Sequence, residues 1–242
     1  MTSIQAGYDL SSMTFSPEGR LFQIEYATKA ISQSPFIIGM ICKDGLVIIS
    51  EKKKKSFNNR DYNLDSIFQF NKNTSIAATG FMNDIFFVVD RARFDNRNHL
   101  KFFADSLGSY SIVTRICTFL HIYTLYCHIR PLACSLIIGT VSSNFYELYL
   151  IFLSGFFIKC FGGVIGINSE LIKVELESLM IKNLSCRKSI ELVIRILKNI
   201  KLQEEKKIVE ILWFSKENYS FLKCISCNVT NENRRLNKLL NL

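Results

Sequence analysis

The sequence predicts an α+β fold in which two antiparallel sheets pack face to face between outer helix layers, a four-layer αββα sandwich. Strand-like blocks alternate with pairs of amphipathic helices rather than with single crossover helices, which favours antiparallel sheets. The chain has 242 residues, of which 48% are hydrophobic, with only 11 glycines and 3 prolines. It can therefore bury one large core, and no segment has the composition of a flexible linker.

The clearest strand signal is an early hairpin. Two apolar runs, at 36–42 and 46–50, flank Lys43-Asp44-Gly45, and an Asp-Gly pair is typical of tight hairpin turns. A further strand is expected at 75–79, closed by Gly80.

The remainder of the chain continues the alternation of helix pairs and strands. Pro131 ends one helical segment, because the residue before a proline is disfavoured in helical geometry, and Ser185 is suited to cap another. The expected elements are helices at 81–103 and 107–127, strands at 134–139, 147–152 and 156–161, helices at 169–182 and 185–198, and a closing hairpin at 208–214 and 219–224.

Ahead of these elements stands the stretch "MTFSPEGRLFQIEYATKAI". Pro17 sets φ for a turn, Gly19 supplies its exit, and a helix is expected to begin near Arg20. This helix has no obvious sheet of its own to cover, so its apolar face is expected to need a surface on a neighbouring subunit. That face consists of Leu21, Ile24, Ala27, Ala30 and Ile31.

The chain is expected to divide into four parts. Residues 1–15 form a tail, 16–32 a docking helix with its entry turn, 33–228 the sandwich, and 229–242 a basic C-terminal tail.

Charge and hydropathy argue against two classes of partner. The formal net charge is +9, but the only dense basic run, Lys52–Lys55, has no interleaved aromatic residues, so no nucleic-acid partner is expected. The run 148–167 has the length of a membrane span, about 20 residues. Ser154-Gly155 and Gly162-Gly163 divide it and Lys159 interrupts it, so two buried strands joined by a turn are favoured and no membrane partner is expected.

Eight scattered cysteines are too few for a disulfide scaffold in a chain of this length and predict a reduced compartment, the cytoplasm and nucleus. The pair Cys224 and Cys227 has metal-ligand spacing but stands alone, whereas zinc needs four ligands. His121 and His128 are about two helical turns apart and cannot chelate one ion. No cofactor or metal is expected.

The chain resembles the α-type subunits of the proteasome core particle. The resemblance is carried by "GYDLSSMTFSPEGRLFQIEYATKAI", "GMICKDGLVIISEKK", "ATGFMNDIF" and "LHIYTLYCHIRPLACSLIIG", and it runs without large gaps from about residue 7 to 225. "GYDLS", "HIYTLY" and "LSCRKSIELVIRILK" are most similar to the alpha type-3 class, at the seventh position of the α ring. The resemblance implies the Ntn-hydrolase form of the αββα sandwich, with the N-terminal helix lying across its top.

The resemblance also implies that the chain is not itself an enzyme. The β-type relatives use an N-terminal threonine whose own amine is the base, assisted by a lysine and an acidic residue. Here the threonine position falls on Pro35, within a peptide bond, the acidic position on Glu51 and the lysine position near Ser66. Thr2 would lie on a tail away from any oxyanion donors. No catalytic residue is expected.

A gate cluster is implied at Tyr8, Asp9, Pro17 and Tyr26. In the family, residues of these types pack between neighbouring subunits and hold the pore open. A tyrosine hydroxyl bonded to an aspartate and braced by a proline is a discrete alternative to a disordered tail, as a two-state gate requires. The alternative is that these residues only fix the turn into the helix.

An activator pocket is implied with reservations. Gly80 and Phe81 approximately match the Gly-Leu pair beside which activator tails dock, but the family's lysine falls on Ser66, so the carboxylate of such a tail would lack its charge partner. Further departures are Leu10 after the aspartate, Ala133 in place of glycine, Phe152-Leu153 in place of Asp-Pro, and the basic rather than acidic C-terminus.

The implied function is a non-catalytic role in α-ring assembly and in gating substrate entry for ubiquitin-dependent protein degradation. The implied partners are the other α-type subunits of a heteroheptameric ring, β-type subunits and a regulatory or activator particle. Two alternatives stay open, a free-standing Ntn-fold hydrolase with another nucleophile and an interaction protein outside the ring.

Overall fold

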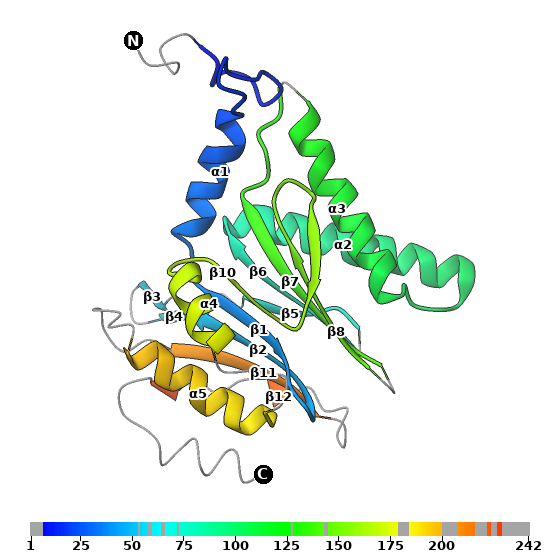
Figure 1. Cartoon of the computed structure of the whole chain (residues 1–242). Helices are drawn as coiled ribbons and strands as arrows, with labels where there is room; N and C mark the ends of the chain where they lie inside the picture. Colours follow the sequence, from blue (N-terminus) through cyan, green and yellow to red (C-terminus); the bar gives the residue numbers. More distant parts are fainter. Residues whose placement is uncertain are drawn as a thin grey trace.

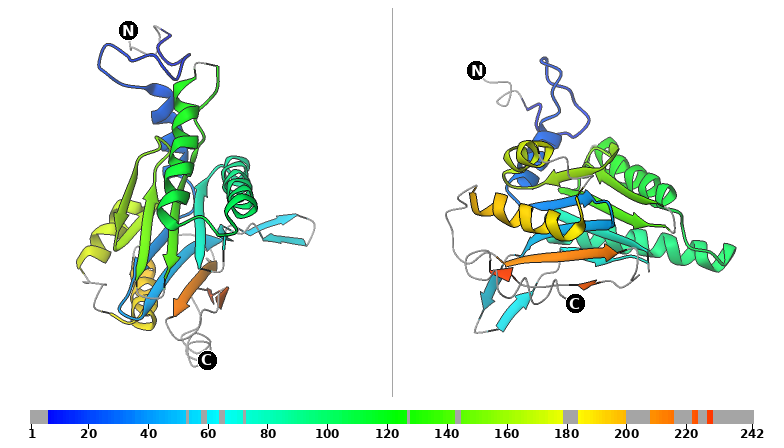
Figure 2. Two further views of the ribbon diagram at one scale, coloured as in Figure 1. Left: turned by 90° about the vertical axis from the view of Figure 1, so that its right-hand side faces the viewer. Right: turned by 60° about the horizontal axis from the view of Figure 1, so that its bottom comes forward.

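A computed structural model shows two sheets packed face to face with a pair of helices on each outer side (Figures 1 and 2). It describes residues 7–52, 54–57, 60–63, 66–71, 73–126, 128–142, 145–178, 184–199, 208–215, 222–223 and 227–228. The predicted αββα sandwich is confirmed.

The first sheet is antiparallel throughout. Its order is β10 (Gly162–Ile165), β1 (Ile37–Ile41), β2 (Gly45–Lys52), β11 (Ile208–Ser215), with β12 (Leu222–Lys223) and β13 (Cys227–Asn228) both paired with β11. The second sheet, also antiparallel, has the order β5 (Ile67–Gln69), β6 (Thr74–Gly80), β7 (Cys134–Val141), β8 (Tyr146–Ile151), β9 (Phe157–Cys160). A separate hairpin consists of β3 (Lys54–Phe57) and β4 (Arg60–Asn63).

The helices cover the outer faces of the sheets. The second sheet is covered by α2 (Met82–Phe103) and α3 (Ser109–Leu125), and the first by α4 (Ser169–Ser178) and α5 (Cys186–Asn199). Side chains alternate along each strand as the pleat requires. On β1, Ile38 and Met40 pack toward the helices, whereas Ile37 and Ile41 pack against the second sheet.

Close packing between the sheets requires small residues at their contact. On β7, a Cβ added to Gly139 would lie 2.8 Å from Cδ2 of Leu46 on β2, which is closer than carbon atoms pack. Glycine at this position lets the Leu46 side chain fill the space between the two sheets.

Most of the predicted elements are confirmed with small shifts in their bounds. The hairpin forms, with Ile41 opposite Leu46 and the N–H of Cys42 bonded to the carbonyl of Gly45 at 2.8 Å. The helices expected at 81–103 and 107–127 are α2 and α3, residue 127 lying outside the described residues. The helix expected at 169–182 is described only to Ser178.

The C-terminal predictions are tested only in part. Leu212 pairs with Lys223, so the closing hairpin is confirmed where it is described. Residues 219–221 and 224 of its second strand, and the tail 229–242, lie outside the described residues.

The apolar run at 148–167 is a β-structure, as predicted, but the prediction of two strands was incomplete. β8 and β9 pair with Leu148 opposite Cys160, and Gly155, at φ +82°, lies in the turn between them. The run then supplies a third strand, β10, which crosses to the first sheet and pairs with β1. β10 was not predicted because its Gly162-Gly163 start breaks the apolar pattern; β3, β4 and β5 were missed because they are only three or four residues long.

The start of α5 shows a cap that the sequence could not reveal. Ser185 occupies the position expected of it, with its carbonyl accepting the N–H of Ser189 at 3.0 Å. The acceptor for the first-turn N–H of Cys186, however, is the carboxylate of Asp44 at 2.7 Å, from the hairpin turn 142 residues away.

Candidate functional site

The N-terminal helix α1 (Phe22–Ser32) lies at one end of the sandwich, over the ends of β6 and β7 (Figure 1). Ala27 and Ile31 pack against Ala133 and Leu153 of the same chain, with Ile24 and Ala30 beside them. The expectation that this apolar face needs a neighbouring subunit was therefore wrong. The chain itself covers this face, because Ala133 in the loop after α3 and Leu153 in the loop after β8 contact the helix.

The turn into α1 has the geometry that its sequence predicts. The N–H of Gly19 bonds to the carbonyl of Ser16 at 2.8 Å across Pro17 and Glu18, and Gly19 has φ +76°. The Ser16 hydroxyl also accepts the N–H of Arg20 at 3.1 Å. A rigid turn thus connects the tail to the helix.

An exposed ion pair fixes the first turn of α1. The guanidinium of Arg20 donates to both carboxylate oxygens of Glu25, one at 2.7 Å, and lies over the Phe22 ring at 5.4 Å. The hydrogen bond from Arg20 lowers the pKa of Glu25 below its usual value. In solvent such a pair contributes little to stability, but it orients the chain where the helix begins.

The tail before the turn is held at two points. The Ser12 hydroxyl, on a buried residue, donates to the carbonyl of Tyr126 at 2.9 Å, just beyond the end of α3. The side-chain amide of Gln23 donates to the carbonyl of Asp9. Residues 7–21 therefore sit above α1 and α3 at the same end of the molecule, as Figure 2 shows.

The four gate-cluster residues lie at this end but are not joined to one another. Tyr8 and Asp9 are half-buried, while Pro17 and Tyr26 are exposed. Tyr26 stacks on Phe22 with ring centroids 6.3 Å apart. In the described part of the chain, no hydrogen bond links any two of the four side chains.

Beneath α1, Arg130 and Asp84 secure the loop on which the helix sits. Arg130 donates two hydrogen bonds to the Asp84 carboxylate, at 2.6 and 2.7 Å, and the N–H of Ala133 donates a third at 2.9 Å. Asp84 is 5% exposed and lies in the first turn of α2, where a negative charge is favourable. Neither residue was predicted from the sequence to have a role here, although both lie in the stretches that carry the resemblance.

The position of the β-type nucleophile carries no such group here. Pro35 precedes β1, and its carbonyl accepts a hydrogen bond from the buried hydroxyl of Thr79 at 2.6 Å. The adjacent Ser34 hydroxyl donates to the carbonyl of Ala30 at 2.9 Å. Both nearby hydroxyls thus donate to backbone carbonyls, and neither belongs to an N-terminal residue with a free amine.

Two further residues at the family's catalytic positions lie in or beside strands of the two sheets. Glu51 lies on β2, with its N–H bonded to the carbonyl of Phe36 at 3.0 Å. Ser66 is buried next to β5, and Thr2 lies outside the described residues.

The residues of the expected activator pocket share one end of the second sheet. The carbonyl of Ser66 accepts the N–H of Ala78 at 3.0 Å, two residues before Gly80. Gly80 has φ +133°, and Phe81, half-exposed at 51%, caps α2 and donates its N–H to the carbonyl of Ala133 at 2.9 Å. The pocket and its use stay predictions.

Within the ranges given above, no three His, Cys, Asp or Glu side chains are grouped so that they could hold a metal ion. None of the helices in these ranges is both long and apolar enough to cross a membrane.

Comparisons with known proteins agree with this geometry. The proteasome subunit family matches residues 31–212. The N-terminal signature of proteasome A subunits matches residues 8–30, which include most of the tail, the turn and most of α1. Proteasome subunit alpha type-3 of Oryza sativa subsp. japonica is 34% identical over 87% of this chain and 85% of its own length. The Arabidopsis thaliana protein of the same name is 34% identical over 90% and 88%, and that of Drosophila melanogaster 36% over 74% and 71%. The chain belongs to the proteasome subunit family, among its α-type members.

Proposed function

We propose that this chain is a non-catalytic subunit of the α ring of a proteasome core particle, at the alpha type-3 position, the seventh of the ring. Its neighbours would be α-type subunits of a heteroheptameric ring, with β-type subunits on one side and a regulatory or activator particle on the other. The threonine-type peptidase activity of the whole particle would reside in β-type subunits. The work of the particle would be ubiquitin-dependent protein degradation in the cytoplasm and nucleus.

One observation carries this proposal. The segment that matches the α-type signature is ordered by its turn and its ion pair. Its helix packs on Ala133 and Leu153 of the same chain. The same segment places Pro35 within the chain at the start of β1, which removes the free N-terminus that an Ntn nucleophile needs. The segment that leaves no free N-terminal nucleophile at Pro35 thus also forms a platform at one end of the molecule.

Because α1 buries its apolar face on its own chain, contacts with ring neighbours would use its outer face and the tail. Tyr26 and Pro17 are exposed there, available to a tail from an adjacent subunit. Tyr8 and Asp9 of this chain would in turn reach the platform of the next subunit. A gate assembled between chains is consistent with the lack of hydrogen bonds among these four side chains in the described part of the chain.

Co-purification tests the proposal. The chain, tagged at its C-terminus and expressed in its own cells, should elute near the mass of a core particle together with six other α-type and the β-type subunits. Recovery as a stable monomer of 27.9 kDa would contradict it and would favour an interaction protein outside the ring. Hydrolysis of fluorogenic peptides by the purified chain alone would instead favour the free-standing hydrolase.

The gate is tested within assembled particles. Tyr26→Phe and Asp9→Asn should lower activator-stimulated peptide hydrolysis and leave the unstimulated rate unchanged, because the cluster stabilises only the open state. Ser32→Ala is the matched control, since the Ser32 hydroxyl is exposed on α1 and bonds only to the carbonyl of Lys29 in its own helix. Stimulation of the two gate variants equal to wild type would show that the residues only shape the turn.

A further inference from the structure

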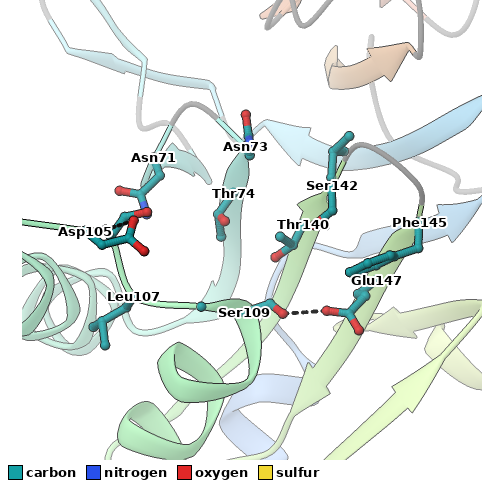
Figure 3. Close-up of a pocket in the computed structure, with 13 residues that line it drawn as sticks. Asn71, Asn73, Thr74, Asp105, Leu107, Ser109, Thr140, Ser142, Phe145 and Glu147 are labelled. Carbon is teal, nitrogen blue, oxygen red and sulfur yellow. Dashed lines mark hydrogen bonds between the residues drawn. The ribbon is translucent and has the colours of Figure 1, made fainter.

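A polar pocket of about 690 Å³ lies at the end of the sandwich opposite α1. It is walled by the start of β6, the end of β7, the start of β8 and the loop between α2 and α3 (Figure 3). β6 begins at this pocket and ends beneath α1, so its seven residues separate the two sites by roughly 20 Å. None of the residues discussed above for gating or activator docking lines it.

The floor of the pocket holds a buried hydroxyl without a partner. Thr140 alternates with Val141, which packs between the sheets, so its side chain lies on the outer face beneath the helices. The residue is 7% exposed, and its hydroxyl oxygen has no hydrogen-bond partner among the described residues. In Figure 3 this oxygen points into the pocket, toward the space between Thr74 and Ser109. An unpaired buried hydroxyl is unfavourable, which favours a ligand that bonds to it.

The charge of the pocket indicates what kind of ligand that is. Among the described residues that line it, only Asp105 and Glu147 are charged, and both are acidic, although the whole chain carries a net charge of +9. The hydroxyl of Ser109 and the ammonium of Lys159 donate to the Glu147 carboxylate, the latter at 2.6 Å. A carboxylate offers about four acceptor sites, so these two bonds leave capacity for further donors. The pocket therefore suits a cation with several N–H groups.

The exposed aromatic residues at and near the pocket favour a protein as the ligand rather than a small metabolite. Phe145 lines it and is 54% exposed, and Phe102 and Phe103, just before Asp105, are 82% and 69% exposed. Aromatic residues are enriched in protein interfaces, where they often contribute much of the binding energy.

We propose that this pocket receives a lysine or arginine side chain of a β-type subunit and so helps seat this chain on the β ring. The proposal rests on the proposed function: if the tail and α1 take part in gating on the activator side, the opposite end of the molecule would face the β-type subunits. Asp105 neutralises the incoming charge, the Glu147 carboxylate, already paired with Lys159, accepts one N–H group, and the Thr140 hydroxyl accepts another.

Reconstitution of the chain with its α-type and β-type partners tests this step. Thr140→Val removes the hydroxyl with little change in shape, and Asp105→Asn removes one charge; each should leave α rings intact and weaken capture of β-type subunits by roughly tenfold, as for loss of a hydrogen bond to a charged group. Thr140→Ser keeps a hydroxyl and should restore capture. Glu177→Gln, on the exposed ion pair with Lys173 on α4, is the control for loss of one negative charge.

The outcomes separate the two proposals. α rings that capture β-type subunits as well as wild type in both Thr140→Val and Asp105→Asn would overturn the pocket proposal while leaving the ring function intact. A wild-type chain that never enters α rings would instead contradict the proposed function. A photo-crosslinking amino acid at Phe145 gives a direct check. Crosslinks to a β-type subunit are expected, and crosslinks only to α-type subunits would assign the pocket to a ring neighbour and refute the proposal.

Discussion

Arg130 holds Asp84 through both terminal nitrogens of its guanidinium group, at 2.6 and 2.7 Å, across 46 residues of sequence. The contact joins the start of α2 to the loop that precedes β7, and the same carboxylate accepts the N–H of Ala133. Since Ala133 is part of the surface on which α1 packs, the ion pair supports the N-terminal helix indirectly. Paired hydrogen bonds of this kind fix geometry as well as adding energy.

Asp84→Ala should lower the free energy of unfolding of the chain by about 2 kcal/mol, because it leaves the N–H of Ala133 and part of Arg130 without an acceptor. Denaturant titration followed by circular dichroism measures the change. Asp90→Ala is the matched control, since Asp90 pairs with Arg93 in solvent and should contribute less than about 1 kcal/mol. Equal losses of unfolding free energy in the two variants would show that the buried Asp84 pair contributes no more stability than an exposed pair.

Ile31→Ala should weaken the packing of α1 against the rest of the chain. Ile31 is 6% exposed between Ala133 and Leu153, and truncation of such a side chain costs about 2–4 kcal/mol. Hydrogen exchange of residues 22–32 should accelerate while that of β1 and β2 is preserved. Val174→Ala on α4, where the side chain is 67% exposed, should leave exchange unchanged. Unaltered protection of α1 in Ile31→Ala would mean that other contacts hold the helix.

Gly80→Ala should destabilise the chain by about 3 kcal/mol or more, because φ at this position is +133°, a region that side chains disfavour. A Cβ there would also lie 2.0 Å from the carbonyl oxygen of Ala133. Thermal unfolding measures the loss. Gly162→Ala on β10 is the control, since the nearest atom to its added Cβ is 3.8 Å away and the change should be within about 1 kcal/mol.

Glu147 should make stability depend on pH in the acid range. Burial alone would raise its pKa, but hydrogen bonds from Lys159 and Ser109 outweigh burial and hold the pKa below the ordinary value of 4.5. A lowered pKa in the folded state means that the ionised form stabilises the fold above about pH 4, and that this contribution is lost as the pH falls through the folded-state pKa.

Glu147→Gln should therefore unfold more easily than wild type at pH 7, and the difference should shrink below about pH 4, where wild type also loses the charge. Unfolding free energies of both proteins at several pH values give the comparison. A difference that is constant from pH 7 to pH 3 would show that ionisation of Glu147 does not contribute. Glu177→Gln, at an exposed pair, should show little difference at any pH.

The layered fold could be predicted from the sequence alone, because local signals agree with the final arrangement. The Asp-Gly turn, the helical spacing in α2, α3 and α5, and the period-two strands each required only neighbouring residues. The turn at Ser16–Gly19 could be predicted for the same reason, since Pro17 and Gly19 restrict their own backbone. The absence of a nucleophile at Pro35 likewise followed from the residue type.

Contacts between residues far apart in the sequence could be seen only in the folded molecule. The apolar pattern of α1 showed that it must be covered but not by what, and the answer was Ala133 and Leu153 of its own chain rather than another subunit. The capping of α5 by Asp44, the crossing of β10 to the first sheet and the pocket around Thr140 join residues far apart in sequence. Such contacts depend on how folded layers lie against one another, which no local periodicity specifies.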